Sequence, residues 1–211
     1  MAGETIMCSI IASYDINKIK ELAKLNEYRG QHSHSFFVYD FITNEFVYTH
    51  KSLGKLNVDV HKEFKNKYYI VHQQAPTGIQ KDSSIHPAIV DDNLLWHNGI
   101  IKSDCVDELK IKLQCSSDWD TLLLLQDLIK NKKPKNIDGT FSCLWYNGEN
   151  IIVFRNEISP LFMDKEMNLS STQFDGSKLL DENIMFCFNL NRKEVNSINK
   201  FETIENPYFF I

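Results

Sequence analysis

The chain has 211 residues, a length typical of one domain. Its hydrophobic content of 43% and charged content of 24% are ordinary for a globular protein and exclude a disordered chain. The formal net charge of -5 argues against a basic surface for nucleic acid, and no apolar run approaches the roughly 20 residues of a membrane span.

Hydrophobic periodicity in the first half of the chain predicts strands and one helix. A near-continuous apolar run indicates a first strand that is buried on both faces, and a helix follows it behind a cap at Asp15. Two short runs rich in aromatic and β-branched residues indicate a hairpin. These elements and a further strand are expected at 7–14 (strand), 16–26 (helix), 35–40 and 45–50 (hairpin) and 68–73 (strand).

The second half predicts one long helix among short strands. The helix is expected over 118–131, where leucines form a broad apolar stripe, and Asn147-Gly148 indicates a tight turn between two strands. Strands are expected at 93–97, 141–146, 151–155, 161–163, 169–172 and 184–190. The whole pattern indicates two packed sheets covered by a few helices in one domain.

Five cysteines are spaced widely and irregularly, and no pair forms a C-x-x-C clip. Cys8 directly follows a methionine near the start of the chain. A cysteine at a chain terminus can cleave amides, because its thiolate attacks while its own α-amine takes up the proton. Cys8 can do so only if residues 1–7 are removed, or if translation begins at Met7 and that methionine is cleaved. The alternative is that Cys8 is a buried strand residue.

Two further segments carry groups that such a reaction needs. Asn98 and Gly99 lie at the end of an expected strand and offer an amide side chain and a backbone N–H for an oxyanion, although Asn-Gly is more often a turn. The segment from Ser116 to Asp120 opens the long helix, where a capping role is expected. A carboxylate there can also hold a substrate ammonium group.

Together and in this order, the motifs resemble the class II glutamine amidotransferase domain, an N-terminal-nucleophile (Ntn) hydrolase, over nearly the whole chain. The most specific match is His86-Pro87 followed by His97-Asn-Gly-Ile-Ile101, which is similar to the family's oxyanion segment. The other matching segments are Met7-Cys-Ser-Ile-Ile11, Tyr28-Arg-Gly-Gln-His-Ser33, His72-Gln-Gln-Ala-Pro-Thr77, Ser117-Asp118 through Leu125, Asp138-Gly-Thr-Phe141 and Arg155 through Phe162.

The resemblance implies an α+β fold, a four-layer αββα sandwich of two mainly antiparallel sheets. It implies a leader or propeptide at 1–7 and one amidotransferase domain at 8–211. It assigns Cys8 as the nucleophile, Asn98 and Gly99 as the oxyanion donors, and Asp118 as the group that binds the α-ammonium of glutamine.

Thr77 would lie beside the carboxylate of the substrate. The family's carboxylate-binding arginine falls on Gln74, and a neutral amide cannot replace a bidentate guanidinium. Arg29 or a lysine elsewhere could compensate, or the substrate could be another amide.

Three functions are therefore open. The first is a glutaminase that releases ammonia through a cysteinyl thioester for a separate synthetase, the second is an amidohydrolase for another amide, and the third is a binding module without catalysis.

We expect neither a cofactor nor direct nucleic-acid or membrane binding. The seven histidines show no H-x-x-x-H spacing, so the sequence predicts no metal site. The start of the chain lacks a basic signal region, which indicates a cytoplasmic protein. The abundance of Lys, Asn and Ile suggests an AT-rich genome, and the resemblance allows a phage as well as a bacterial source.

Overall fold

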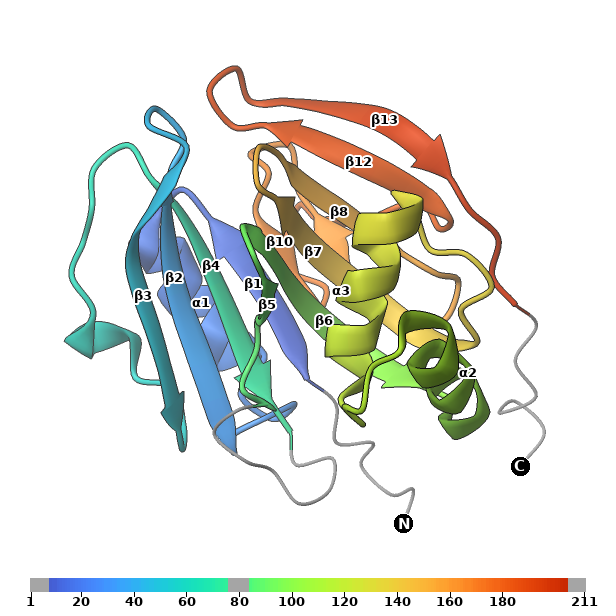
Figure 1. Cartoon of the computed structure of the whole chain (residues 1–211). Helices are drawn as coiled ribbons and strands as arrows, with labels where there is room; N and C mark the ends of the chain where they lie inside the picture. Colours follow the sequence, from blue (N-terminus) through green and yellow to red (C-terminus); the bar gives the residue numbers. More distant parts are fainter. Residues whose placement is uncertain (1–7, 76–83, 205–211) are drawn as a thin grey trace, which may run out of the picture. The chain divides into compact units, whose positions relative to one another are not determined.

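The computed structural model describes residues 8–75 and 84–204 (Figure 1). The chain forms two compact units, and each is built from segments that are distant in the sequence. The first unit comprises Met1–Pro87, Pro160–Leu180 and Leu190–Glu194. The second comprises Ala88–Ser159, Asp181–Asn189 and Val195–Ile211.

The first unit contains a seven-stranded antiparallel sheet, in the order β11-β9-β10-β1-β4-β2-β3. Helix α1 lies against one face of this sheet (Figure 1). The elements are β1 (Ser9–Ser13), α1 (Ile16–Leu25), β2 (Ser33–Asp40), β3 (Glu45–Leu53), the 3-10 helix η1 (Val58–Val60), β4 (Tyr68–Gln74), β9 (Phe162–Met163), β10 (Leu169–Ser170) and β11 (Lys178–Leu179).

The predicted start of α1 is confirmed, because the Asp15 carboxylate accepts a hydrogen bond from the Asn17 N–H at 2.8 Å. One stripe of the helix is buried, as its spacing predicts. Its residues pack on apolar side chains of β2 and β4; the buried members of this cluster include Ile16, Ile19, Leu22, Ala23, Phe36, Val38, Tyr69 and Val71.

The second unit contains a six-stranded sheet, in the order β13-β12-β8-β7-β6-β5. Its elements are β5 (Ala88–Val90), β6 (Asn93–Ile101), α2 (Ser103–Leu113), α3 (Asp120–Asn131), β7 (Gly139–Asn147), β8 (Ile151–Arg155), β12 (Ile184–Asn189) and β13 (Glu194–Lys200). Helix α3 packs on this sheet through Leu123, Leu124, Leu125 and Leu128, which join Leu95, Phe141, Cys143 and Trp145 in one core.

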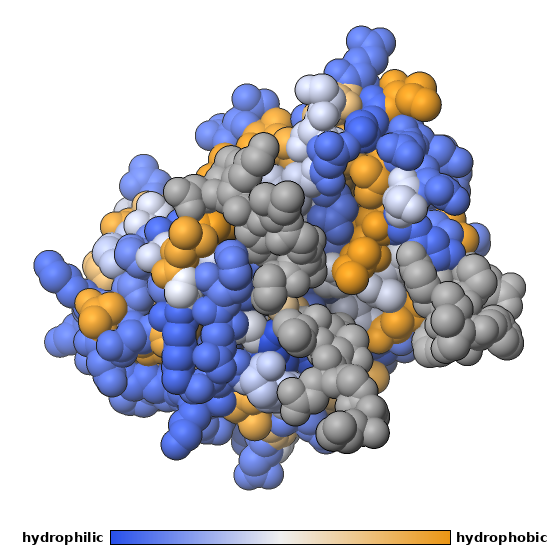
Figure 2. All heavy atoms as spheres, turned by 90° about the horizontal axis from the view of Figure 1, so that it is seen from below, coloured by the Kyte–Doolittle hydropathy of each residue, from blue (hydrophilic) through white to orange (hydrophobic). Residues whose placement is uncertain are grey.

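The α+β class with two antiparallel sheets and flanking helices is confirmed. Helix α2 and strands β5, β11 and β13 were not predicted. None of the helices in the described ranges has the length and apolar character to span a bilayer. On the face shown in Figure 2, hydrophilic side chains dominate the described surface and hydrophobic ones form small separate patches.

Candidate active site

Cys8 directly precedes β1, and 7% of its surface is exposed. Its carbonyl oxygen accepts a hydrogen bond from Nε of Arg29 at 3.0 Å. The next residue, Ser9, pairs with Gln73 of β4 and donates its hydroxyl to the Gln73 side-chain oxygen at 3.2 Å. A buried guanidinium and a strand ladder thus fix the backbone at the Cys8 carbonyl group and at the residue after it.

Gln74 lies at the end of β4, and both ends of its side-chain amide are hydrogen bonded. Its oxygen accepts from the Ser33 hydroxyl at 3.0 Å, and its nitrogen donates to the Ser84 carbonyl at 3.3 Å. The backbone is equally crowded, since a Cβ on Gly30 would lie 2.5 Å from the Gln74 carbonyl carbon. The amide therefore bridges neighbouring segments of the first unit. Thr77, the other residue expected near the substrate carboxylate, lies outside the described residues.

Asn98 and Gly99 lie inside β6, opposite Ser142 and Phe141 of β7. The prediction that they end a strand was wrong, because β6 continues to Ile101. Asn98 is fully buried, and its amide nitrogen lies 3.5 Å from the Ser142 hydroxyl as a hydrogen-bond donor. Its backbone carbonyl accepts from the Ser159 hydroxyl at 2.9 Å. This asparagine is thus held rigidly in the sheet.

Gly99 has a φ angle of +148°, which L side chains rarely adopt. A Cβ at this position would lie 1.9 Å from the Thr140 carbonyl oxygen and 2.9 Å from Nε2 of His97. Only glycine therefore fits here, because the Thr140 carbonyl of β7 occupies the space that a Cβ atom would need.

A polar network that no sequence motif reveals connects β6 with the start of α3. Nδ1 of His97 lies 3.1 Å from the Thr121 hydroxyl. Asp120 accepts from the backbone N–H of Thr121 at 2.7 Å and from that of Ile101 at 3.2 Å. These contacts fix the strand segment on either side of Asn98 and Gly99. His97 opens the segment His97–Ile101 that resembles the family's oxyanion segment, and this resemblance was the signal in the sequence that could have identified it.

Asp118 lies two residues before α3, and 85% of its side chain is exposed. The Lys110 ammonium of α2 forms an ion pair with it and holds the pKa of the carboxyl below its usual value. The Ser117 hydroxyl accepts from the Trp119 N–H at 3.1 Å, which shapes the turn into the helix. Asp118 therefore presents an ionised carboxylate at the surface of the second unit.

The predicted residues fall into two groups. Cys8, Arg29 and Gln74 belong to the first unit, whereas Asn98, Gly99 and Asp118 belong to the second.

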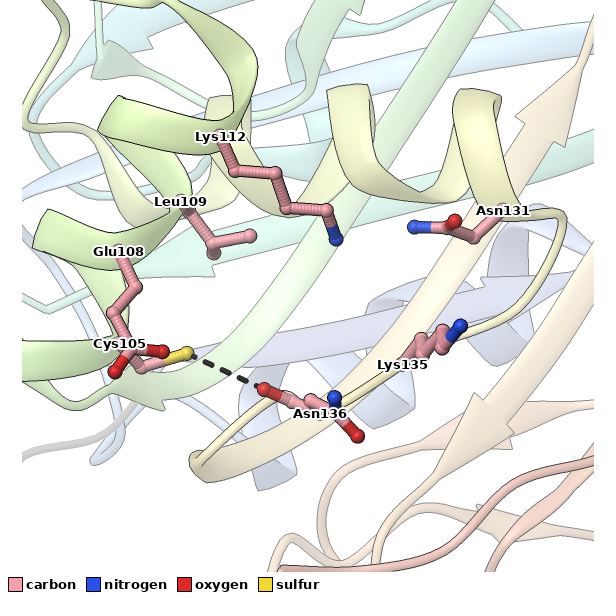
Figure 3. A pocket seen from close by; sticks show the side chains of 7 residues that line it. All are labelled: Cys105, Glu108, Leu109, Lys112, Asn131, Lys135 and Asn136. Carbon is pink, nitrogen blue, oxygen red and sulfur yellow. Dashed lines mark hydrogen bonds between the residues drawn. The ribbon is translucent and has the colours of Figure 1, made fainter.

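A surface pocket of the second unit contains none of the predicted residues (Figure 3). The pocket lies between α2 and the connection from α3 to β7, where the Cys105 thiol donates to the Asn136 carbonyl at 3.8 Å. Its lining residues are Cys105, Glu108, Leu109, Lys112, Asn131, Lys135 and Asn136.

The fold is similar to that of several solved structures. The glutamine phosphoribosylpyrophosphate (PRPP) amidotransferase of B. subtilis, in complex with ADP and GMP, matches 94% of this chain at a TM-score of 0.63 and 18% identity. An allosteric regulatory enzyme of purine biosynthesis matches 93% at a TM-score of 0.66 and 19% identity. A glutamine aminotransferase class-II domain protein from Silicibacter pomeroyi matches 92% of this chain and 99% of its own length, at a TM-score of 0.51 and 8% identity.

The chain has the fold of a class II glutamine amidotransferase domain, which confirms the Ntn-hydrolase-like fold predicted from its motifs. It spans about half the length of the first two structures, since each is covered to 49%. No protein-family profile matches the sequence, and no curated protein matches it significantly.

Proposed function

We propose that this protein hydrolyses the side-chain amide of glutamine and that Cys8, once it is the first residue, is the nucleophile. The observation that carries the proposal is that a cysteine precedes the first strand of an amidotransferase fold, with its carbonyl held by the buried Arg29. The solved structures with this fold include a protein named as a glutamine PRPP amidotransferase and one named as a glutamine aminotransferase class-II domain protein.

The reaction uses both polar groups of an N-terminal cysteine. The Cys8 thiolate attacks the amide carbonyl while the α-amine, with an ordinary pKa of about 7.7–8.0, takes the thiol proton and returns it to the departing nitrogen. Ammonia leaves, a γ-glutamyl thioester remains, and water hydrolyses the thioester to glutamate. An amide nitrogen cannot accept this proton, so residues 1–7 must be removed first.

We assign stabilisation of the tetrahedral intermediate to Asn98 and Gly99. Charge develops on the former carbonyl oxygen, and donors that are already rigid need not reorganise to meet it. Asn98 is fully buried in β6, and Gly99 has no side chain to restrict the approach to its backbone. In a site of this kind, loss of one donor costs a factor of about 10²–10³ in kcat.

We assign the α-ammonium of the substrate to the exposed Asp118 carboxylate and place Thr77 beside the α-carboxylate. Because the Gln74 amide is occupied at both ends, we assign the missing cationic contact to Arg29. Its Nε holds the Cys8 carbonyl, and its Nη2 is buried without a hydrogen-bond partner among the described residues. Nη2 is therefore a donor that can bind a carboxylate.

The released ammonia needs an acceptor, and we propose that a separate cytoplasmic synthetase supplies it. The engagement of Gln74 favours a second candidate, an Ntn amidohydrolase for a different amide. Trapping Cys8 with electrophiles that mimic glutamine, asparagine and simple acyl donors distinguishes the two. Selective capture by the glutamine mimic supports the first, and equal or preferential capture by another donor supports the second.

The decisive experiment uses protein whose mass confirms Cys8 as the first residue. We expect this protein to release ammonia from glutamine and Cys8→Ala to reduce the rate by at least about 10³-fold. Cys115→Ser, at a partly exposed cysteine of the second unit, is the control and should retain full activity. Unchanged activity in Cys8→Ala would refute the proposal. Retention of residues 1–7 in protein from its native source would instead favour a binding module without catalysis.

A further inference from the structure

Three histidines that lie outside the motifs used above converge in the first unit. His34 lies on β2, His50 on β3, and His61 directly follows η1. One ring nitrogen from each lies within 4.8 Å of the other two. We propose that His34, His50 and His61 form a binding site for a divalent transition-metal ion, with Zn²⁺ preferred.

The sheet register explains why two of the rings meet. Phe36 of β2 is directly opposite His50 of β3, and the two strands run side by side (Figure 1). Since His34 is two residues from Phe36, both histidines point to the same face of the sheet. Their ring centroids are 5.6 Å apart.

The segment after β3 brings the third ring to this face. The His61 ring stacks on that of Phe36, with centroids 4.1 Å apart and an interplanar angle of 9°. Its centroid lies 5.1 Å from that of His50. The three ligands come from three separate elements, 16 and 11 residues apart in sequence, so a search for H-x-x-x-H spacing on one helix does not detect them.

Hydrogen bonds orient two of the rings as in known metal sites. Nδ1 of His34 lies 2.9 Å from the Gly54 carbonyl, which can only accept, so Nδ1 carries the proton and Nε2 has the free lone pair. Nδ1 of His61 is 3.1 Å from the Tyr48 hydroxyl. Metal-binding histidines typically use their second nitrogen in this way, which fixes the tautomer and the ring orientation.

Nε2 of His61 is a buried polar atom with no hydrogen-bond partner among the described residues. Leaving a buried nitrogen without a partner is costly, and a metal ion would satisfy it.

The donor set indicates the metal. Three imidazoles without a carboxylate suit Zn²⁺ and related ions rather than Mg²⁺ or Ca²⁺. Tetrahedral Zn²⁺ with bonds of about 2.0–2.1 Å brings its ligand nitrogens to roughly 3.4 Å from one another, so small ring rotations are required. His50 is only partly buried, so its ring can turn. The ion would tie the segment 54–61 to β2 and β3.

The test titrates metal-free, untagged protein with Zn²⁺ and, separately, with Co²⁺. We expect one equivalent of Zn²⁺ to bind and to raise Tm by about 5 °C at saturating metal. We expect Co²⁺ to give visible tetrahedral absorption without the near-ultraviolet band of a cysteine thiolate. His50→Gln and His61→Gln should each weaken binding at least about 100-fold.

His32→Gln, which changes a histidine outside the cluster, is the matched control and should bind as the parent does. His50→Gln carries the test even if His61→Gln fails to fold, because the His50 side chain is partly exposed. Absence of stoichiometric binding would overturn the proposal. So would unchanged affinity in a folded His50→Gln protein, or a Co²⁺ spectrum with thiolate character.

Discussion

Gly99 shows how one residue type can be demanded by backbone geometry rather than by side-chain chemistry. It lies within a strand, where glycine normally weakens the structure because it has no side chain to pack. Here the φ angle is +148°, and any Cβ atom would lie 1.9 Å from the Thr140 carbonyl oxygen. No residue other than glycine therefore fits at this position. The same close approach positions the N–H that we assign to the oxyanion.

We predict that Gly99→Ala lowers the free energy of unfolding by at least about 3 kcal/mol, because a rigid backbone carbonyl blocks the added methyl group. Urea unfolding followed by circular dichroism measures the loss. Gly176→Ala is the control, since Gly176 also has a positive φ of +74° but no atom lies within 4 Å of its Cβ position. That variant should lose only about 1–2 kcal/mol, the cost of the left-handed backbone alone. Equal losses in the two variants would contradict the steric explanation.

Residue types indicated the candidate chemistry, but their surroundings could not be predicted. An Asn-Gly pair typically forms a turn, and only the pairing with β7 shows that Asn98 and Gly99 continue a strand. The sequence likewise placed Gln74 at the position of a family arginine. The Gln74 amide forms hydrogen bonds with Ser33, 41 residues away, and Ser84, 10 residues away. Only the fold brings these residues together, so the sequence could not predict the two contacts.

Elements with a dense apolar stripe were predictable, whereas α2 and β13, which bury few residues and lack a clear periodicity, were not. Helix α3 has a run of leucines and was found, although it begins at Asp120 because the preceding residues form a turn. Helix α2 buries only Cys105 and Leu109, so its periodicity is weak. Strand β13 is almost entirely exposed and shows no alternation of polar and apolar residues that could reveal it.

The stability of the hairpin formed by β2 and β3 should depend on pH through Asp40. Asp40 ends β2, accepts from the turn N–H groups of Ile42 and Thr43 at 2.9 and 3.3 Å, and pairs with Lys67 at 2.6 Å. Lys67 and the turn N–H groups lower the pKa of Asp40 below its ordinary value. The ionised carboxylate therefore stabilises the fold fully when the pH is above the ordinary pKa of an aspartate. This stabilisation is lost as the pH falls through the lowered pKa of Asp40 in the folded protein.

We expect Asp40→Asn to lower the free energy of unfolding by about 1 kcal/mol at pH 7, because the amide still accepts from the turn but loses the charge. The difference from the parent should shrink toward zero as the pH falls below the lowered pKa. Urea unfolding at a series of pH values measures it. Glu27→Gln, in the more exposed pair with Lys55, is the control and should change stability by less than about 0.5 kcal/mol. A constant difference at all pH values would disprove the electrostatic origin.

At the scale of the whole molecule, neither compact unit is a continuous stretch of chain. Residues 160–180 complete the sheet of the first unit, where β10 pairs with β1 through Ile11 and Ser170. Residues 181–189 add β12 to β8 in the second unit. Local sequence patterns carry no information on such long-range pairing, which is why the two-unit organisation could not be predicted from periodicity.

We predict that a fragment of residues 8–159 does not fold, although it retains all three α-helices of the described chain and most of the strands. It would leave β1 and β8 each without one partner strand and would remove a set of buried side chains from both cores. Each large apolar side chain contributes about 2–5 kcal/mol, against a total stability of about 5–15 kcal/mol. The lost side chains include Leu161, Met167, Leu169, Phe174, Leu180, Met185, Phe188, Leu190 and Phe201.

The measurement is the dispersion of amide signals in a two-dimensional NMR spectrum, together with the cooperativity of urea unfolding. A fragment of residues 8–204 is the control and should give a dispersed spectrum and one cooperative transition, because it keeps every described strand. The shorter fragment should give collapsed signals and no cooperative transition. If the shorter fragment unfolds cooperatively with the parent's midpoint, the segments after Ser159 add little to the stability of either core, and the prediction is wrong.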